Sequence, residues 1–151
     1  MKSVKVLFVC VHNSARSQMA EAFLNQLGNS GFFAESAGLE PGTLNQVVVS
    51  AMKLEGIDIS GNKTKTVDSI IASGKKFDYV ITVCDESNAE RCPIIPGAGK
   101  RINWSFDDPS TLNGSYAEKL DQTLLIMSEI KTRIETWIKE LQTLNKLPES
   151  I

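Results

Sequence analysis

Two residues near the start of the chain, Cys10 and Arg16, have the character and spacing of a nucleophilic site that binds an anion. Five residues separate them, and Ser17 follows the arginine directly. A cysteine thiolate is a strong nucleophile, and the planar guanidinium of arginine binds two oxygens of a tetrahedral anion at once. The hydroxyl of Ser14 or Ser17 could donate a hydrogen bond to the sulfur. This pattern predicts a cysteine that attacks a bound oxyanion.

The segments on either side of this loop indicate how it is held. Residues 4–9 are short, rich in β-branched side chains and almost uncharged, which is typical of a strand buried on both faces of a parallel sheet. Over residues 17–27 apolar side chains recur at helical spacing, and Gly28 can end the helix. The loop is therefore expected between the carboxyl end of a strand and the amino end of a helix.

A loop in this position is suited to bind an oxyanion, because unpaired backbone N–H groups and the helix dipole both attract negative charge. The same groups, together with the guanidinium of Arg16, stabilise a thiolate at Cys10. His12 is the only histidine of the chain, and we expect its side chain to point outward without a catalytic role. The residues expected to bind the anion are Val11, His12, Asn13, Ser14, Ala15, Arg16 and Ser17.

Two further cysteines, Cys84 and Cys92, follow a strand predicted at residues 78–83. Residues 85–91 between them are polar and compatible with a helix, and a loop rich in proline and glycine comes next. Ligands of open parallel sheets bind beyond the carboxyl ends of the strands. Cys10 and Cys84 should therefore lie at the same edge of the sheet, which puts a second thiol near the first.

A proton donor is needed wherever a thiolate displaces an oxygen leaving group. Asp108 stands directly before Pro109, in the loop after a modest fourth strand predicted at residues 101–104. We take Asp108 as the candidate general acid and Asp107 as the less favoured alternative. Both aspartates could instead simply begin a turn before the proline.

The predicted elements alternate between strand and helix along the chain. After the first strand and helix come a strand at 32–38, a helix ended by Gly56, a short helix at 66–71, strands at 78–83 and 101–104, and a long helix from 116 to about 144. This alternation favours a doubly wound α/β fold. From the length we expect a single catalytic domain, residues 1–151, with its core at about 4–144 and a loose tail after Lys146.

Composition excludes several classes of protein. A formal net charge of −2 gives no reason to expect a nucleic-acid partner. No apolar run reaches the length of a membrane span, and residues 1–3 pass directly into the first strand, so we expect a cytoplasmic protein without a membrane partner. Three cysteines without a Cys-x-x-Cys pair or a cluster with histidine predict neither structural disulfides nor a zinc site. We expect no metal and no cofactor.

Taken together, these motifs resemble the low-molecular-weight protein tyrosine phosphatase fold family and, within it, the thioredoxin-coupled arsenate reductases. The resemblance covers about residues 4–140. It rests on the Cys-x5-Arg-Ser loop, the Ser-Ala-Gly run at 36–38, the pair Cys84 and Cys92, and the run Trp-Ser-Phe-Asp-Asp-Pro at 104–109. It implies a three-layer α/β fold with a four-stranded parallel sheet in the order 2-1-3-4.

The resemblance also implies a reaction, the reduction of arsenate to arsenite by three cysteines in turn. Cys10 attacks arsenate held by Arg16 and the loop amides, while Asp108 protonates the departing oxygen. Cys84 then attacks Cys10, and arsenite leaves. Cys92 attacks Cys84, and thioredoxin or a glutaredoxin reduces the resulting disulfide. Phosphate and sulfate would act as analogues of arsenate.

Closing this disulfide places a demand on the segment between the two cysteines. Residues eight apart on an intact helix are about 12 Å apart, whereas the Cα atoms of a disulfide are about 4.4 to 6.8 Å apart. Residues 85–91 should therefore unwind or loop out on oxidation, and Pro96, Gly97 and Gly99 should help the following segment to shift.

Two positions depart from the family pattern. Ala15 stands where many members have a further cysteine, and Lys65 stands where an aspartate is expected in the potassium site of some members. An ammonium group at that place could replace the ion, so we expect little dependence on potassium. The residues expected to support the loop are Asn13, Ser17, Glu21, Ser36 and Lys65.

Two alternatives remain open. A low-molecular-weight phosphatase acting on phosphotyrosine or a small phosphate ester would use Cys10, Arg16 and Asp108 in the same roles, with the other two cysteines as bystanders. Residues 110–112, directly after Pro109, are Ser-Thr-Leu and lack the tyrosines that line a phosphotyrosine cleft in typical members, although a weak phosphatase side activity is compatible with a reductase. A phosphocarrier of the sugar-transport type would accept phosphate on Cys10 and would need no internal acid.

Overall fold

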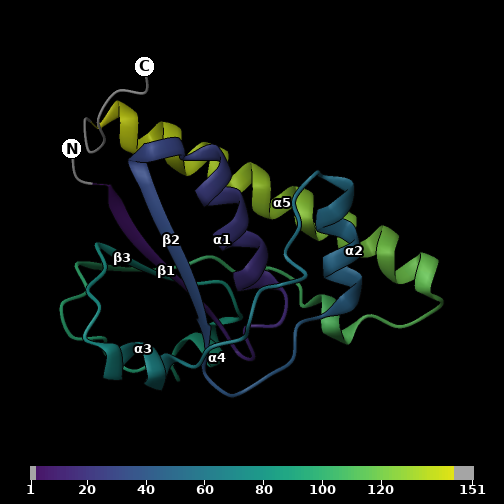
Figure 1. Ribbon diagram of the computed structural model, residues 1–151, viewed down its shortest axis with the longest axis horizontal. Helices are drawn as coiled ribbons and strands as arrows, with labels where there is room; N and C mark the ends of the chain where they lie inside the picture. The colour runs from purple at the N-terminus through teal and green to yellow at the C-terminus, as the bar shows by residue number, and fades with distance from the viewer. Residues whose placement is uncertain (1–2, 145–151) are drawn as a thin grey trace.

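The computed structural model describes residues 3–144, in which one four-stranded sheet lies between layers of helices (Figure 1). All the strands are parallel, and their order is β2-β1-β3-β4. This arrangement confirms the predicted fold class and strand order. The strands are β1 (Val4–Cys10), β2 (Phe32–Gly38), β3 (Tyr79–Thr82) and β4 (Lys100–Asn103).

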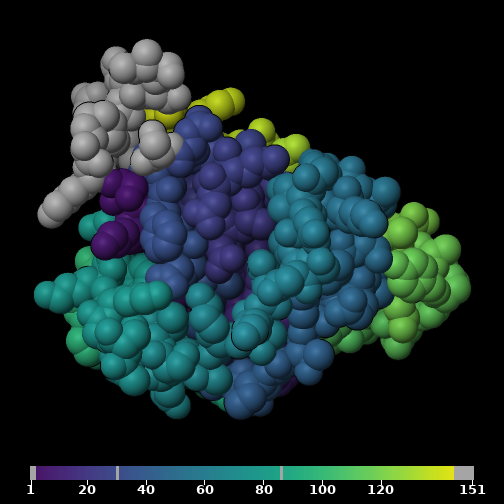
Figure 2. Space-filling model, viewed as in Figure 1, coloured from purple at the N-terminus to yellow at the C-terminus, as the bar shows by residue number. Residues whose placement is uncertain are grey.

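Helices cover both faces of the sheet. On one face α1 and α5 pack on the strands and α2 packs against α5, while α3 lies on the other face (Figure 1). Figure 2 shows α1 and α2 side by side on the surface, with the start of α5 in yellow-green projecting beyond α2. The helices are α1 (Arg16–Leu27), α2 (Gln46–Leu54), α3 (Val67–Ser73), α4 (Glu86–Ala89) and α5 (Tyr116–Thr143), with 3-10 turns at Asn29–Gly31 and Pro109–Thr111.

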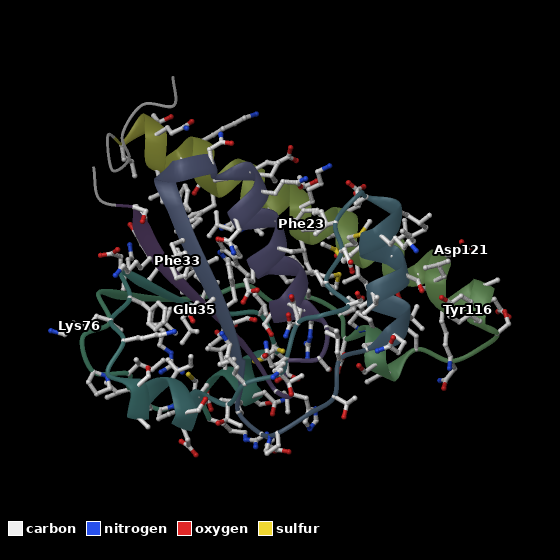
Figure 3. The ribbon with its side chains drawn as sticks, viewed as in Figure 1. Phe23, Phe33, Glu35, Lys76, Tyr116 and Asp121 are labelled. Carbon is white, nitrogen blue, oxygen red and sulfur yellow. The ribbon has the colours of Figure 1, made fainter. Side chains whose placement is uncertain are left out.

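The central strand β1 is buried on both faces, as its apolar run predicted. Successive side chains of a strand point to opposite faces of the sheet. Phe8 and Cys10 therefore belong to the larger core cluster, beneath α1, α2 and α5, and Phe23 of α1 lies in the same cluster (Figure 3). Leu7 and Val9 belong to the smaller cluster, beneath α3. Cys10, the last residue of β1, is thus fixed on the α1 and α5 face.

Aromatic packing fixes the chain just beyond β4. The ring of Trp104 lies 6.1 Å from that of Phe8 and 5.5 Å from that of Trp137 on α5, measured between centroids. The backbone N–H of Trp104 donates to the carbonyl of Thr82 at 2.8 Å and so extends the sheet by one residue. Residues 105–108 leave the sheet from this anchored point.

The helix predicted at residues 85–91 is wrong in extent, because α4 covers only Glu86–Ala89. The Asp85 carboxylate accepts the N–H of Asn88 at 2.8 Å and begins the turn. The N–H groups of Arg91 and Cys92 then reach back only three residues, and Pro93 has no N–H with which to continue. An intact helix joining Cys84 to Cys92 is therefore absent from this structure.

The larger core cluster contains residues from both ends of the described chain, from Val6 in β1 to Leu141 in α5.

Within residues 3–144, no helix combines the length and the apolar character needed to span a membrane. The loose tail predicted after Lys146 falls outside the residues that the structure describes.

Candidate active site

The segment from the end of β1 to the start of α1, residues 10–17, is called the anion loop below. Its carbonyl groups fasten it to the chain that follows β2. The carbonyls of Cys10, Val11 and Ser14 accept N–H groups of residues 39, 40 and 45 at 3.0, 2.8 and 2.9 Å. Among residues 3–144, the N–H groups of residues 11–15 have no hydrogen-bond partner. The loop therefore presents a series of free backbone donors at the amino end of α1, which is the arrangement that binds an oxyanion.

Asn13 holds this loop from inside. It is fully buried and has a φ of 55°, a left-handed conformation that asparagine tolerates better than most residues. Its Nδ2 donates to Ser17 Oγ at 2.8 Å, and its Oδ1 accepts the backbone N–H of Lys65 at 2.9 Å. One side chain thus ties the loop to α1 and to a segment 52 residues away.

Gln18 supports the loop in the same way, although it is not among the supporting residues expected from the sequence. The side chain is buried, and its Nε2 donates to both the carbonyl oxygen and the Oδ1 of Asn13 at 3.2 Å. Its Oε1 accepts Nδ2 of Asn62 at 3.1 Å. The available signal was a polar amide immediately after the loop, in the first turn of a helix that faces the core.

Ser17 is the hydroxyl that contacts the sulfur of Cys10, with an Oγ to Sγ distance of 2.9 Å. Both side chains are buried. Because Asn13 already donates to this hydroxyl oxygen, the hydroxyl proton is free to point at the sulfur. The hydroxyl can therefore donate a hydrogen bond to the nucleophile that the sequence predicted.

Arg16 reaches from the loop to the segment that carries the candidate acid. Its Nη1 donates to the carbonyl of Phe106 at 3.1 Å, and its Nη2 lies 3.5 Å from Oδ2 of Asp108. The other carboxylate oxygen of Asp108 accepts the N–H of Ser110 at 2.9 Å. Nε of Arg16 is buried and has no hydrogen-bond partner within the described residues. The guanidinium therefore keeps a donor for a further acceptor.

Cys84 lies beside this loop, as the strand pattern predicted. Val9 pairs with Thr82 across the sheet, so Cys84 extends one residue beyond the level of Cys10. Burial, partly opposed by the Arg16 charge, raises the pKa of the Cys84 thiol to about 11, and a Cys10 thiolate adds to the rise. The structure thus brings Cys10, Arg16, Cys84 and Asp108 to one edge of the sheet.

Cys92 is held elsewhere, in the smaller core cluster with Val9, Val80 and Ile95. All three cysteines are free thiols. Burial raises the pKa of the Cys92 thiol, and the charge of Arg101 partly opposes that rise. The third candidate cysteine therefore lies in a different core cluster from Cys10.

A second group of charged side chains is formed by Glu21, Glu35, Lys65 and Lys75, and the backbone N–H of Lys65 connects it to Asn13 of the anion loop. Burial raises the pKa of Glu21, while a 2.9 Å hydrogen bond from Ser36 and the charge of Lys65 oppose the rise. Nζ of Lys65 and of Lys75 lie 3.3 and 2.8 Å from the same oxygen of Glu35. Burial alone would raise the pKa of Glu35, but these two ammonium groups lower it overall. Glu35, labelled in Figure 3, was not expected from the sequence.

His12 points away from the anion loop, as expected. Its half-exposed side chain places Nε2 3.3 Å from Oε1 of Glu40. Glu40 also pairs with Arg91, the residue before Cys92. A surface charge cluster therefore connects the back of the loop with the end of the segment that contains α4.

The sequence matches the model of the low molecular weight phosphotyrosine protein phosphatase family over residues 5–147. An arsenate reductase of Bacillus subtilis (strain 168) is 38% identical over 135 residues, which are 89% of this chain and 95% of that protein. The solved structure "An arsenate reductase in the phosphate binding state" has a TM-score of 0.73 and 29% identity, covering 91% of this chain and 98% of that one.

A thioredoxin-dependent arsenate reductase of Corynebacterium glutamicum has a TM-score of 0.65 and 30% identity, covering 95% of this chain and 63% of that one. The range matched by the family model includes β1 from its second residue, the anion loop, Cys84, Cys92 and the segment with Asp108. The chain therefore belongs to the low molecular weight phosphotyrosine protein phosphatase family, and the arsenate reductases are its relatives within that family.

Proposed function

We propose that this protein reduces arsenate to arsenite, with Cys10 as the nucleophile and with Cys84 and Cys92 as the thiols that carry the electrons onward. The observation that carries the proposal is the buried Cys84 thiol at the edge of the sheet where Cys10 lies, one residue beyond its level and within reach of the charge of Arg16. Hydrolysis of a phosphate ester needs no second thiol at this place. The relatives named above are arsenate reductases, which supports the same assignment.

The first step uses the anion loop. The free N–H groups of residues 11–15 and the guanidinium of Arg16 bind arsenate, and the Cys10 thiolate attacks the arsenic. A sulfur–arsenic bond forms, and an arsenic–oxygen bond breaks with a proton from Asp108, so that water leaves. The location of Asp108 next to the anion site, with its Oδ2 3.5 Å from Nη2 of Arg16, supports this role.

The second step reduces the arsenic. Cys84 loses its proton and attacks the sulfur of Cys10, which forms a disulfide between them. The electron pair of the sulfur–arsenic bond stays on arsenic, so arsenic(V) becomes arsenic(III) and arsenite leaves. Because the pKa of Cys84 is raised to about 11, the deprotonation of this thiol is a costly part of the step at neutral pH.

The third step frees Cys10. The Cys92 thiolate attacks Cys84, a disulfide joins these two cysteines, and Cys10 leaves as a thiolate. Cys92 must first leave the smaller core cluster, so residues 85–91 change their conformation. Thioredoxin then reduces the Cys84–Cys92 disulfide, with a glutaredoxin as the other candidate. A similar solved structure is thioredoxin-dependent, and such a reductant is consistent with a cytoplasmic location.

The residues behind the loop keep it in shape. We assign Asn13, Ser17, Glu21 and Ser36 to this support, within one catalytic domain of residues 1–151. The ammonium of Lys65, which lies near Glu21 and Glu35, supplies a fixed positive charge that makes a bound potassium ion unnecessary.

A second candidate function is the hydrolysis of phosphate monoesters. The arrangement of Cys10, Arg16 and Asp108 is sufficient for it, and the family model is that of phosphatases. Arsenate and phosphate have the same shape and nearly the same charge. A weak phosphatase activity is therefore expected beside arsenate reduction.

The deciding experiment follows NADPH oxidation on adding arsenate, in the presence of thioredoxin and thioredoxin reductase. The wild type should turn over, whereas the Cys10→Ser, Cys84→Ser and Cys92→Ser variants should each lose multiple turnover. Hydrolysis of phosphate esters without reductant, unaffected by Cys92→Ser and accompanied by no arsenate reduction, would assign the protein as a phosphatase instead.

A further inference from the structure

Arg101 on β4 binds the main chain of the redox segment, which we define as residues 84–92. Its Nη1 donates to the carbonyl of Cys92 at 2.9 Å, and its Nη2 donates to the carbonyl of Ala89. Both acceptors lie at or just beyond the end of α4, and the carbonyl of Ala89 also accepts the N–H of Cys92 at 3.1 Å. The fork of a guanidinium can serve two such carbonyls together.

The position of Arg101 is set by the sheet. It pairs with Val80 across β3 and β4, and Trp104 anchors the chain three residues later. The side-chain hydrogen bonds of Asp85, in contrast, go to Ser87 and Asn88 within the redox segment itself. Arg101 therefore links the end of this segment to a rigid element.

We propose that Arg101 is a positioning residue that holds the Cys92 end of the redox segment in its dithiol arrangement and so sets how readily the Cys84–Cys92 disulfide forms. The proposal rests on the proposed function for the role of this cysteine pair. Cys92 is buried in the smaller core cluster, whereas Cys84 lies beside Cys10. The turn that carries Cys92 must leave Arg101 before the two sulfurs can join. The dithiol form keeps both hydrogen bonds, and the disulfide form loses them.

The surroundings of Arg101 limit the size of this effect. A surface hollow of about 510 Å³ lies beside it, lined by Thr82, Ala89, Glu90, Arg101, Ile102 and Asn103. Water can reach the guanidinium there and replace the two carbonyl groups when the segment moves. The net preference for the dithiol is therefore expected to be modest, because water repays part of each lost hydrogen bond.

The experiment measures the redox equilibrium of the pair in a Cys10→Ser background, which leaves Cys84 and Cys92 as the only thiols. The protein is equilibrated with mixtures of reduced and oxidised dithiothreitol, alkylated, and analysed by mass spectrometry. Each disulfide formed transfers two electrons and two protons to oxidised dithiothreitol. Arg101→Met should raise the equilibrium constant for disulfide formation about tenfold, which is about 30 mV more negative in reduction potential. Arg101→Lys should show most of this change, because one ammonium cannot replace the fork.

The matched control is Lys100→Met, which removes a neighbouring exposed charge of β4 and should leave the equilibrium unchanged. Thermal unfolding of the reduced variants checks that each one folds. The proposal is overturned if Arg101→Lys keeps the wild-type equilibrium, or if Arg101→Met shifts it no more than Lys100→Met. This measurement needs no arsenate. If the redox equilibrium shifts as expected but the wild-type protein does not reduce arsenate, only the proposed function is contradicted. If the wild type reduces arsenate but Arg101→Met leaves the redox equilibrium unchanged, only this inference is contradicted.

Discussion

The anion loop and the redox segment both follow strands of one sheet, yet they are held in opposite ways. The loop is bonded through its carbonyls to the chain after β2 and through the buried Asn13 to α1 and to Lys65. The redox segment has one helical turn, and the polar contacts of Asp85 stay within the segment. Its far end is linked to β4 by Arg101 and to Glu40 by Arg91.

This difference corresponds to what each region is proposed to do. Donors that bind charge in a transition state are most effective when they are already in place and need no reorganisation. Thiol exchange over a distance requires a sulfur to move, so few contacts should oppose the movement. Chemistry at a fixed loop and transfer by a displaceable segment can therefore share one small fold.

The largest effect should come from Arg16→Lys, which tests whether the anion loop acts independently of the redox segment. The variant loses the contacts with Phe106 and Asp108 and the free Nε. Arsenate turnover should fall by about 1,000-fold, the upper range for loss of an oxyanion donor. The Cys84–Cys92 redox equilibrium should stay as in the wild type. A large shift in that equilibrium would show that the two regions are coupled.

Asp108→Asn should lower the rate of arsenate reduction by about 100-fold, because the departing oxygen no longer receives a proton. Phosphate binding, followed by calorimetry, should change little. Asp107→Asn is the matched control, with an expected loss of less than about threefold, since removing an exposed charge has a small effect. The reverse ranking of the two variants would make Asp107 the acid.

The rate at which Cys84 attacks Cys10 should depend on pH. Since burial raises the pKa of Cys84 to about 11, its thiolate fraction grows about tenfold per pH unit between pH 7 and 9. In a Cys92→Ser variant, the rate of the disulfide formed between Cys10 and Cys84 on adding arsenate should rise in proportion. Rapid quenching and mass spectrometry give this rate. A flat profile over that range would mean that another group removes the proton first.

Gln18→Met tests how the support of Asn13 contributes to the anion loop. The substitution keeps the volume and removes both hydrogen bonds to Asn13. A buried group without a partner costs about 1 to 3 kcal/mol, so the free energy of unfolding should fall by about that amount and phosphate affinity about tenfold. Asn62→Ala removes only the outer partner of Gln18 and should have a smaller effect. Equal effects of the two variants would contradict a special role of Gln18.

The smallest effect is expected on replacing sodium by potassium in the arsenate assay. The ammonium of Lys65 already lies 3.3 Å from Glu35, so the turnover rate should change by less than about twofold, because a fixed charge supplies the attraction of the ion. Stimulation by potassium well above that value would show that the loop still needs a bound cation.

The strand order was implied only by the resemblance to the family. The sequence patterns by themselves were sufficient to predict the parallel sheet and the joint position of Cys10, Arg16, Cys84 and Asp108. These features follow from local patterns, since apolar runs define the strands and the carboxyl ends of parallel strands meet at one edge. The length of α4 was predicted less well, because the choice between a continuing helix and a short capped turn depends on contacts of Asp85 and Pro93.

Glu35 and Arg101 had no signal of their own in the sequence, because their partners lie far away along the chain or are backbone groups. For Gln18 the only signal was a polar amide in the first turn of a helix that faces the core, and its partner Asn62 lies 44 residues away. The placement of Cys92 in a different core cluster from Cys10 likewise depends on which face each side chain meets. The sequence thus determined which chemical groups this protein has and the edge of the sheet where they gather. The tertiary structure alone decided how each of them is held, because that depends on hydrogen bonds and packing between distant segments.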